Sequence, residues 1–293
     1  MNDGGPDFLV IGAQKCGTTT LYEDLRAHPA IRIPEKESAW LLDHDVTTAD
    51  GRAAYGAAFG PRPPGGLVGE VATDYAMLPA IDAVSRARLV SDSLRIIYIV
   101  RNPIDRVISH HHHRLSEQQA PANIEDALEQ CPDLVDNSRY ATQIAPWIDA
   151  YGRERVHVVR FEDYVANRQR EVGRLHEFLG LDQVPLARPE QAHNVAATKR
   201  VAVGRWRSFY RSRLYQRALR RVLPVRVRRF SARLLLPKPP PRPDPPTAET
   251  LARLAQELGP EVERLAQLLG TEPWWRLEPP TPEQPAANEK QDR

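Results

Sequence analysis

Four runs of mostly apolar residues recur along the chain, each followed by glycine or polar residues. The runs are 8–11, 67–71, 94–100 and 155–159. A continuous apolar run of this length is typical of a strand that is buried on both faces of a parallel sheet. The segment 31–33, between Pro29 and Pro34, predicts one further short extended stretch.

Helical spacing of apolar residues separates these runs. It predicts helices over 18–27, 79–90, 104–115, 124–130, 139–151, 171–179, 249–258 and 261–269. Asn123 and Ser138 are the expected N-caps of two of these helices, and Gly180 ends a third. The stretch 35–60 is charged and has no clear period. The alternation predicts an α/β fold with a central parallel sheet of about four or five strands, flanked by helices.

The first strand runs into a loop bounded by Gly12 and Gly17, and then into a helix. Backbone N–H groups of such a loop, with the helix N-terminus, form an anion site. In the P-loop of nucleotide triphosphatases, a lysine directly follows the second glycine and reaches the β/γ-phosphates. Here Thr18 occupies that position, and the lysine is Lys15, inside the loop. The loop therefore predicts phosphate binding without the features needed for a triphosphate and its metal.

Two stretches together resemble the sulfotransferases that use 3′-phosphoadenosine 5′-phosphosulfate (PAPS). Q-K-C-G-T-T-T-L-Y at 14–22 resembles their 5′-phosphosulfate loop, and R-I-I-Y-I-V-R-N-P-I-D-R-V-I-S at 95–109 resembles their 3′-phosphate motif. In that family an arginine that ends a central strand and a serine eight residues later bind the 3′-phosphate. Arg101 and Ser109 have this spacing, and a guanidinium fork with a hydroxyl two turns into the helix suits a phosphate. The resemblance covers about residues 7–277 and implies the P-loop-like sulfotransferase fold.

The resemblance also implies the reaction, which is transfer of SO₃ from PAPS to a hydroxyl or amine of a carbohydrate, lipid or secondary metabolite. The patterns K-E-S-A-W at 36–40 and G-E-V-A-T-D-Y at 69–75 are closest to the carbohydrate (heparan-type) and bacterial branch. A glutamate in the first pattern is the base there, and Glu37 occupies its position. Heparan-type members carry a lysine where this chain has Val71. If Glu37 is not the base, His44, Asp74 or a histidine among 110–113 is the next candidate.

The implied functional residues combine the loop, the strand end and a later basic pair. Lys15 has a catalytic role beside Glu37, because its charge would stabilise the leaving oxygen. Lys199 and Arg200 belong to a loop that closes over the adenosine and the 3′-phosphate. The cofactor-binding residues are Gln14, Lys15, Cys16, Gly17, Thr18, Thr19, Thr20, Arg101, Ser109, Lys199 and Arg200. No metal is implied, and the four successive histidines from 110 to 113 cannot converge on one ion, because helix neighbours point about 100° apart.

Composition narrows the class of protein further. A formal net charge of +2 over 293 residues gives no indication of nucleic-acid binding. Cys16 and Cys131 form neither a disulfide framework nor a zinc spacing, which fits a reducing compartment. The first residues lack a secretory pattern and no 18 apolar residues run together, so we expect a cytoplasmic protein. The Arg-, Ala- and Pro-rich composition is typical of a GC-rich bacterial genome. The basic, amphipathic segment 205–233 can attract an anionic membrane weakly.

We expect a single domain over residues 7–277, with a Pro-rich surface linker at 237–247 inside it and a disordered tail at 278–293. Two other functions remain open. A small-molecule or nucleotide kinase would share the sheet and the phosphate loop, and dependence on ATP and Mg²⁺ would favour it. A non-catalytic nucleotide-binding module would keep the site without turnover, and measurable transfer to any acceptor would exclude it.

Overall fold

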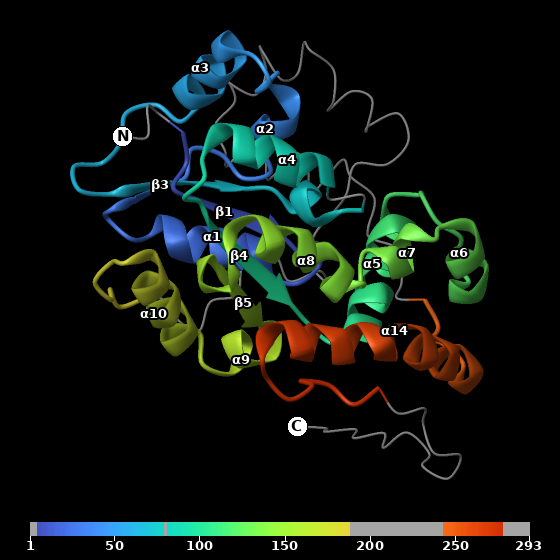
Figure 1. Cartoon of the computed structure of the whole chain (residues 1–293). Coiled ribbons are helices and arrows are strands. Elements are labelled where there is room, and N and C mark those ends of the chain that lie inside the picture. The colour runs from blue at the N-terminus through green and yellow to red at the C-terminus, as the bar shows by residue number, and fades with distance from the viewer. Residues whose placement is uncertain (1–4, 79–80, 188–242, 278–293) are drawn as a thin grey trace, which may run out of the picture.

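The computed structural model describes residues 5–78, 81–187 and 243–277. Its centre is a five-stranded sheet in the order β2-β3-β1-β4-β5 (Figure 1). All neighbouring strands are parallel. The strands are β1 (Phe8–Gly12), β2 (Ile31–Arg32), β3 (Leu67–Val71), β4 (Arg95–Val100) and β5 (Val156–Arg160). The predicted α/β fold with a parallel sheet of four or five strands is confirmed.

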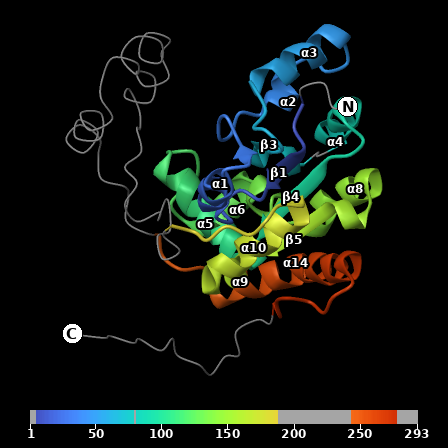
Figure 2. The ribbon, with the colours of Figure 1, turned by 90° about the vertical axis from the view of Figure 1, so that its left-hand side faces the viewer.

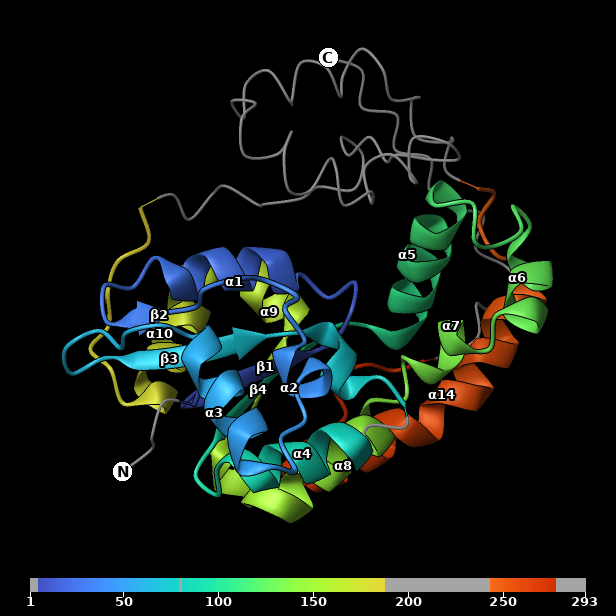
Figure 3. The same ribbon diagram turned by 90° about the horizontal axis from the view of Figure 1, so that it is seen from above.

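Helices cover both faces of the sheet. One face carries α1 (Thr18–Arg26), α9 (Phe161–Ala166) and α10 (Arg168–Leu179), and the other carries α4 (Ile81–Val90) and α8 (Tyr140–Tyr151) (Figure 3). Every residue of β1 is buried, as is every residue of β4 after Arg95. Because both faces are covered, these central strands are continuously apolar rather than alternating.

The remaining described elements lie around this three-layered centre. They are α2 (Trp40–Asp43), α3 (Ala49–Ala58), α5 (Pro103–Ser116), α6 (Ile124–Gln130), α7 (Asp133–Asp136), α14 (Ala248–Leu269) and the 3₁₀ turns η1 (Thr73–Ala76) and η2 (Arg153–Arg155). Figure 2 shows α2 and α3 at one end of the molecule and α14 at the other. Within the described ranges, no helix is long and apolar enough to cross a membrane.

Helix α14 packs against α8 and α5. Its first half adds Leu254 and Leu258 to a small apolar cluster with α5, α6 and α7, and its second half adds Val262 and Leu265 to the main core. The prediction of two helices, 249–258 and 261–269, is wrong, because one helix runs through Pro260. A proline weakens a helix interior by removing an N–H and crowding the preceding turn. Burial of apolar residues on both sides of Pro260 keeps the two halves continuous.

Two local expectations also differ from the structure. The stretch 35–60 contains α2 and α3, and the side chain of Thr48 caps α3. Of the ten residues of α3, Tyr55 and Gly56 are the buried ones, so its apolar face is too narrow to give a visible period. Ser138 is not the N-cap of α8. Its hydroxyl accepts a hydrogen bond from Arg106 and donates one to the carbonyl of Pro103. The expected caps at 123 and 180 are confirmed.

Candidate functional site

The glycine-bounded loop lies between β1 and α1, at the carboxyl edge of the sheet. Gly17 is the N-cap of α1 in the left-handed conformation, with φ 88°. A Cβ at this position would lie 2.8 Å from Cε2 of Phe161. The N–H groups of Thr18 and Thr19 begin the helix and have no acceptor within it. The local backbone therefore offers the amide-rich helix N-terminus that anions favour.

The predicted binding residues of this loop do not all face the same way. The side chain of Cys16 is fully buried, with its Sγ 3.7 Å from the hydroxyl of Tyr140, and burial raises the pKa of this thiol. Only the backbone of Cys16 is therefore placed to meet a ligand. Thr18 and Thr20 are also buried. The partly exposed members are Gln14, Lys15, Gly17 and Thr19.

Arg101 follows β4, the strand next to β1. Its guanidinium pairs with Asp105 at 3.4 Å across one helical turn, and its side chain is 22% exposed. Ser109 lies further along α5 and is half-buried. Asn102 caps α5, since its side-chain oxygen accepts from the amides of Ile104 and Asp105. The second predicted motif is therefore an ordered strand-to-helix junction beside the first.

Phe161 joins the two motifs, and no sequence motif indicated this role. It follows β5, and its ring lies against Gly17 on one side and 5.3 Å from the guanidinium carbon of Arg101 on another. An arginine over an aromatic ring gains a cation–π attraction. The next residue, Glu162, accepts a hydrogen bond of 2.8 Å from the backbone N–H of Asn102. The start of α9 therefore supports both strand-to-helix junctions.

Glu37 lies at the same edge of the sheet, on the β3 side of the loop. Its backbone N–H donates to the carbonyl of Val71 at 2.7 Å, and the preceding Lys36 forms a parallel bridge with Val71. Glu37 has a φ of 57°. In an extended chain adjacent side chains point to opposite faces, whereas here the Lys36 ammonium contacts the Glu37 carboxylate. The backbone of Lys36 thus lies beside Val71, and its ammonium group contacts the carboxylate of Glu37.

A buried carboxylate fixes the loop that follows Glu37. Glu70 is 1% exposed and accepts three hydrogen bonds, from the hydroxyl of Ser38 at 2.9 Å, the backbone N–H of Trp40 at 2.8 Å and the hydroxyl of Tyr55 at 2.7 Å. Two of these donors belong to the turn that carries Glu37. The sequence contained one indication of this buried carboxylate, namely an acidic residue inside the otherwise apolar strand L-V-G-E-V. Burial and the charge of Glu70 raise the pKa of the Tyr55 hydroxyl.

Of the alternative bases, Asp74 is the one whose charge is coupled to Glu37. It lies in η1, directly after β3, and partial burial together with the negative charges of Glu37 and Asp43 raises its pKa. His44 contacts the carbonyl of Trp40 through Nδ1 at 2.9 Å. The carboxyl groups of Glu37 and Asp74 therefore interact electrostatically at this edge of the sheet.

The four histidines lie in different surroundings along α5. His110 and His111 are buried; Nδ1 of His110 contacts Arg106 at 2.7 Å, and Nε2 of His111 contacts the carbonyl of Pro121 at 2.8 Å. Within residues 5–78, 81–187 and 243–277, no group of three His, Cys, Asp or Glu side chains is placed to hold a metal ion. Lys199, Arg200 and the basic segment 205–233 lie outside the described residues, so their predicted roles stay predictions.

Comparison with known proteins points to one family. A family model described as "Sulfotransferase domain" matches residues 5–200. Heparan sulfate glucosamine 3-O-sulfotransferase 3B1 of Mus musculus is 27% identical over 188 residues, which cover 61% of this chain and 47% of that protein. Heparan sulfate glucosamine 3-O-sulfotransferase 6 of Homo sapiens is 28% identical over 187 residues, covering 61% and 53%. The chain thus spans about half the length of the curated relatives it matches.

A solved structure shares the fold over most of its length. The sulfotransferase from Alicyclobacillus acidocaldarius superimposes with a TM-score of 0.61 at 21% identity, covering 91% of this chain and 96% of that one. At this identity the match shows the fold alone.

Proposed function

This chain belongs to the sulfotransferase family, and we propose that it transfers a sulfuryl group from PAPS to a hydroxyl or amine of an acceptor. One observation carries the proposal. The loop with Lys15 and the junction with Arg101 follow adjacent parallel strands, β1 and β4, and Phe161 touches both. Ligands of open α/β sheets bind at this carboxyl edge. Two phosphate sites side by side suit a nucleotide with phosphates at both its 5′ and 3′ positions.

Two buried polar atoms support a nucleotide in this region. Oε1 of Gln14 and Nε of Arg101 are buried, and neither has a hydrogen-bond partner among the described residues. Leaving such an atom unpaired costs about 1–3 kcal/mol. The first is an acceptor and the second a donor, so a ligand rich in both kinds of group relieves both costs. The residues present therefore fit a bound nucleotide.

In this proposal the loop binds the 5′ end of the nucleotide. We assign its phosphate to Lys15 and to the N–H groups of Gly17, Thr18 and Thr19. PAPS, when bound, supplies the sulfuryl group and the 5′-phosphate from which that group departs. The ammonium of Lys15 then stabilises the negative charge that grows on the bridging oxygen. This lysine binds the donor and also lowers the barrier.

The neighbouring strand-to-helix junction, with Arg101 and Ser109, binds the 3′-phosphate of the nucleotide in this proposal. The guanidinium of Arg101 offers two parallel donors to phosphate oxygens, and the hydroxyl of Ser109, on α5, provides a third. Phe161 and Asp105 hold the guanidinium in place. Because ATP and ADP lack a 3′-phosphate, this subsite distinguishes the donor from common nucleotides.

Glu37 is the proposed base. It takes the proton of the acceptor hydroxyl or amine while the acceptor atom bonds to sulfur and the bond from sulfur to the bridging oxygen breaks. A positioned base contributes about 10²–10⁴-fold to such a step. Lys36, beside it, supplies positive charge at the β3 edge. Asp74 is the alternative base, because it shares this edge and is coupled to Glu37.

The acceptor is proposed as a carbohydrate, lipid or secondary metabolite. The names of the curated relatives state a glycan, heparan sulfate glucosamine. A kinase is not favoured, because the family is that of sulfotransferases and Thr18 replaces the lysine that follows the second glycine of a P-loop. A non-catalytic module stays open as the second alternative.

The first test is a calorimetric titration with 3′-phosphoadenosine 5′-phosphate (PAP), ADP and ATP in metal-free buffer. We expect PAP to bind at micromolar concentration or better, with ADP and ATP at least about tenfold weaker, and Arg101→Ala to lose most of the PAP affinity. Arg95→Ala is the matched control, since Arg95 begins the same strand at its opposite end. Tighter binding of ATP than PAP would instead favour the kinase.

The second test is transfer from radiolabelled PAPS to a panel of glucosamine oligosaccharides, simple phenols and amines. We expect Glu37→Gln to lower kcat by at least about 100-fold while PAP affinity stays unchanged. Glu35→Gln is the control, because Glu35 is exposed and lies two residues away. If Glu37→Gln kept full turnover, Asp74 would become the leading base. PAP binding without transfer to any acceptor would favour the non-catalytic module.

A further inference from the structure

A guanidinium lies buried beneath the phosphate loop without a counter-ion. Arg106, on α5, is 0% exposed. It donates to the carbonyl of Gln14 at 3.2 Å, the carbonyl of Leu134 at 2.9 Å and the hydroxyl of Ser138 at 3.0 Å, and it contacts Nδ1 of His110 at 2.7 Å. All four partners are neutral. Among the described residues, no carboxylate forms an ion pair with it.

The histidine partner does not supply the missing negative charge. Burial, followed by the positive charge of Arg106, lowers the pKa of His110 to about 2, so the imidazole is neutral. Its Nδ1 accepts from Arg106, and its proton is therefore on Nε2. Burial also lowers the pKa of Arg106, but a guanidinium stays protonated in proteins. A buried charge without a partner is costly, and here the hydrogen bonds to neutral groups offset the cost only in part.

The position of Arg106 connects this charge to the ligand side of the loop. The carbonyl that it contacts belongs to the peptide between Gln14 and Lys15, and the N–H of Lys15 is the other end of that peptide. A donor on the carbonyl polarises the peptide and makes its N–H a stronger donor, as in any chain of hydrogen bonds. Positive charge behind the loop also favours an anion in front of it.

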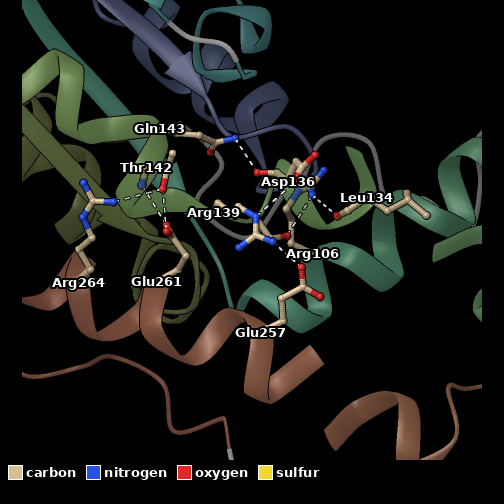
Figure 4. A network of polar contacts seen from close by, with 10 residues as sticks. Arg106, Leu134, Asp136, Arg139, Thr142, Gln143, Glu257, Glu261 and Arg264 are labelled. Carbon is tan, nitrogen blue, oxygen red and sulfur yellow. Dashed lines mark hydrogen bonds and ion pairs between the residues drawn. The ribbon is translucent and has the colours of Figure 1, made fainter. Parts of the chain in front are cut away.

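Helix α7 and the turn that follows it hold Arg106 in this position, and α14 contacts that turn through Arg139. Figure 4 shows Arg106 reaching Leu134 of α7, with Arg139 beside it between Asp136 and Glu257. Asp136 ends α7, and Glu257 belongs to α14. The C-terminal helix, which lies beyond the residues matched by the family model, thus braces the segment that anchors the guanidinium.

We propose that Arg106 is an electrostatic positioning residue of the nucleotide site, whose buried charge is balanced by the 5′-phosphate or phosphosulfate group held in the loop. This inference rests on the proposed function, because it needs an anion at the Lys15 loop. It adds that the affinity of the loop for the 5′ group depends on a charge that never touches the ligand. Affinity for a nucleotide that lacks a 5′-phosphate is independent of Arg106.

The test compares two ligands in calorimetric titrations, PAP and adenosine 3′-monophosphate, which differ in the 5′-phosphate. For Arg106→Gln, which removes the charge and keeps hydrogen-bonding groups, we expect PAP to bind at least about tenfold more weakly and adenosine 3′-monophosphate to change by less than about twofold. Ser138→Ala is the matched control. It removes one hydrogen bond from the same guanidinium but leaves the charge, so the ratio of the two affinities should stay within about twofold of wild type.

Arg106→Lys keeps the test decisive if Arg106→Gln does not fold. It preserves the charge with fewer hydrogen bonds, and we expect it to keep the wild-type ratio of the two affinities within about threefold. Equal losses for both ligands in Arg106→Gln, an unchanged PAP affinity in that variant, or a ratio shifted by more than about threefold in Arg106→Lys would overturn the inference alone. A wild-type protein that binds neither PAP nor adenosine 3′-monophosphate would overturn the proposed function as well.

Discussion

Replacement of Glu70 by glutamine tests whether a buried carboxylate positions the proposed base. Glu70 accepts hydrogen bonds from Ser38, Trp40 and Tyr55, and its side chain is almost completely buried. In Glu70→Gln one oxygen remains to accept from Ser38 and Trp40, while an amide nitrogen faces the hydroxyl of Tyr55. The shape of the side chain is kept, so the change removes charge without creating a cavity.

The expected size follows from the three bonds. A hydrogen bond to a charged group contributes about 1.5–3 kcal/mol and one between neutral groups about 0.5–1.5 kcal/mol. Three bonds therefore lose about 3 kcal/mol together, and the smaller cost of burying a neutral amide offsets part of this. We expect the free energy of unfolding to fall by about 1–3 kcal/mol, measured by urea denaturation.

The effect on catalysis should exceed the effect on donor binding. Ser38 and Trp40 flank the turn that carries Glu37, and a displacement of about 1 Å at a reacting group can cost about 100-fold in rate. We expect Glu70→Gln to lower kcat by at least about tenfold, with PAP affinity within about twofold of wild type, because these hydrogen bonds of Glu70 join it to Ser38, Trp40 and Tyr55 and not to the phosphate loop.

Glu171→Gln is the matched control for this prediction. Glu171 is 5% exposed on α10, where it pairs with Arg170 and Arg174, away from the turn of Glu37. It should lose stability while kcat is retained. A folded Glu70→Gln protein with wild-type kcat, or one that loses PAP affinity as strongly as kcat, would refute the positioning role of Glu70.

Three further predictions follow from local contacts. Gly17→Ala places a methyl group against the Phe161 ring at a residue with a positive φ, and it should weaken PAP binding by at least about tenfold. Gly65→Ala is the control, because Gly65 also has a positive φ but lies in open space, and it should leave PAP binding unchanged. Equal effects of the two substitutions would contradict the steric argument. Asp24→Ala removes the carboxylate that pairs with Arg168, whose side chain is 10% exposed. In denaturant titrations it should lower the free energy of unfolding by about 3–5 kcal/mol. A loss below about 1 kcal/mol would show that the ion pair is not effectively buried. Burial, reinforced by the charge of His28, lowers the pKa of His176 to about 4. As the pH falls, the unfolded state therefore binds the proton of His176 first, and the free energy of unfolding should fall by up to about 1.4 kcal/mol per pH unit from about pH 6.5 down to 4. His176→Phe should reduce this slope, and an unchanged slope would refute the assignment.

The strands were predictable because burial on both faces of the sheet requires an apolar residue at nearly every strand position. The runs at 8–11, 67–71 and 94–100 are apolar throughout or nearly so, since helices cover both faces of the sheet. Helix α3 has no clear apolar period in its sequence, because little of its surface is buried. Ser138 was assigned as a cap from its residue type, but its hydroxyl is engaged by Arg106 from another helix. A tertiary partner thus replaced the local hydrogen bond that the sequence favoured.

For the candidate site, the residues proposed to contact a ligand stand in motifs, whereas the residues that support them do not. Lys15, Arg101 and Glu37 stand in recognisable patterns, and the structure brings all three to one edge of the sheet. Their proposed roles await the binding and transfer measurements. Phe161, Glu70 and Arg106 could not be assigned, because their partners are 144, 32 and 92 residues away along the chain, counted from Phe161 to Gly17, from Glu70 to Ser38 and from Arg106 to Gln14.

The sequence by itself determined the parallel α/β architecture and the two motifs that we propose to bind phosphate. These properties are local, since they depend on apolar periodicity, on glycine at a turn and on short spacings within one strand-loop-helix unit. Only the tertiary structure decided how the units meet, with Lys36 beside Val71 and a buried guanidinium beneath the loop. The physical reason is that burial and charge compensation depend on every element packed around a group, and no window of sequence contains them all.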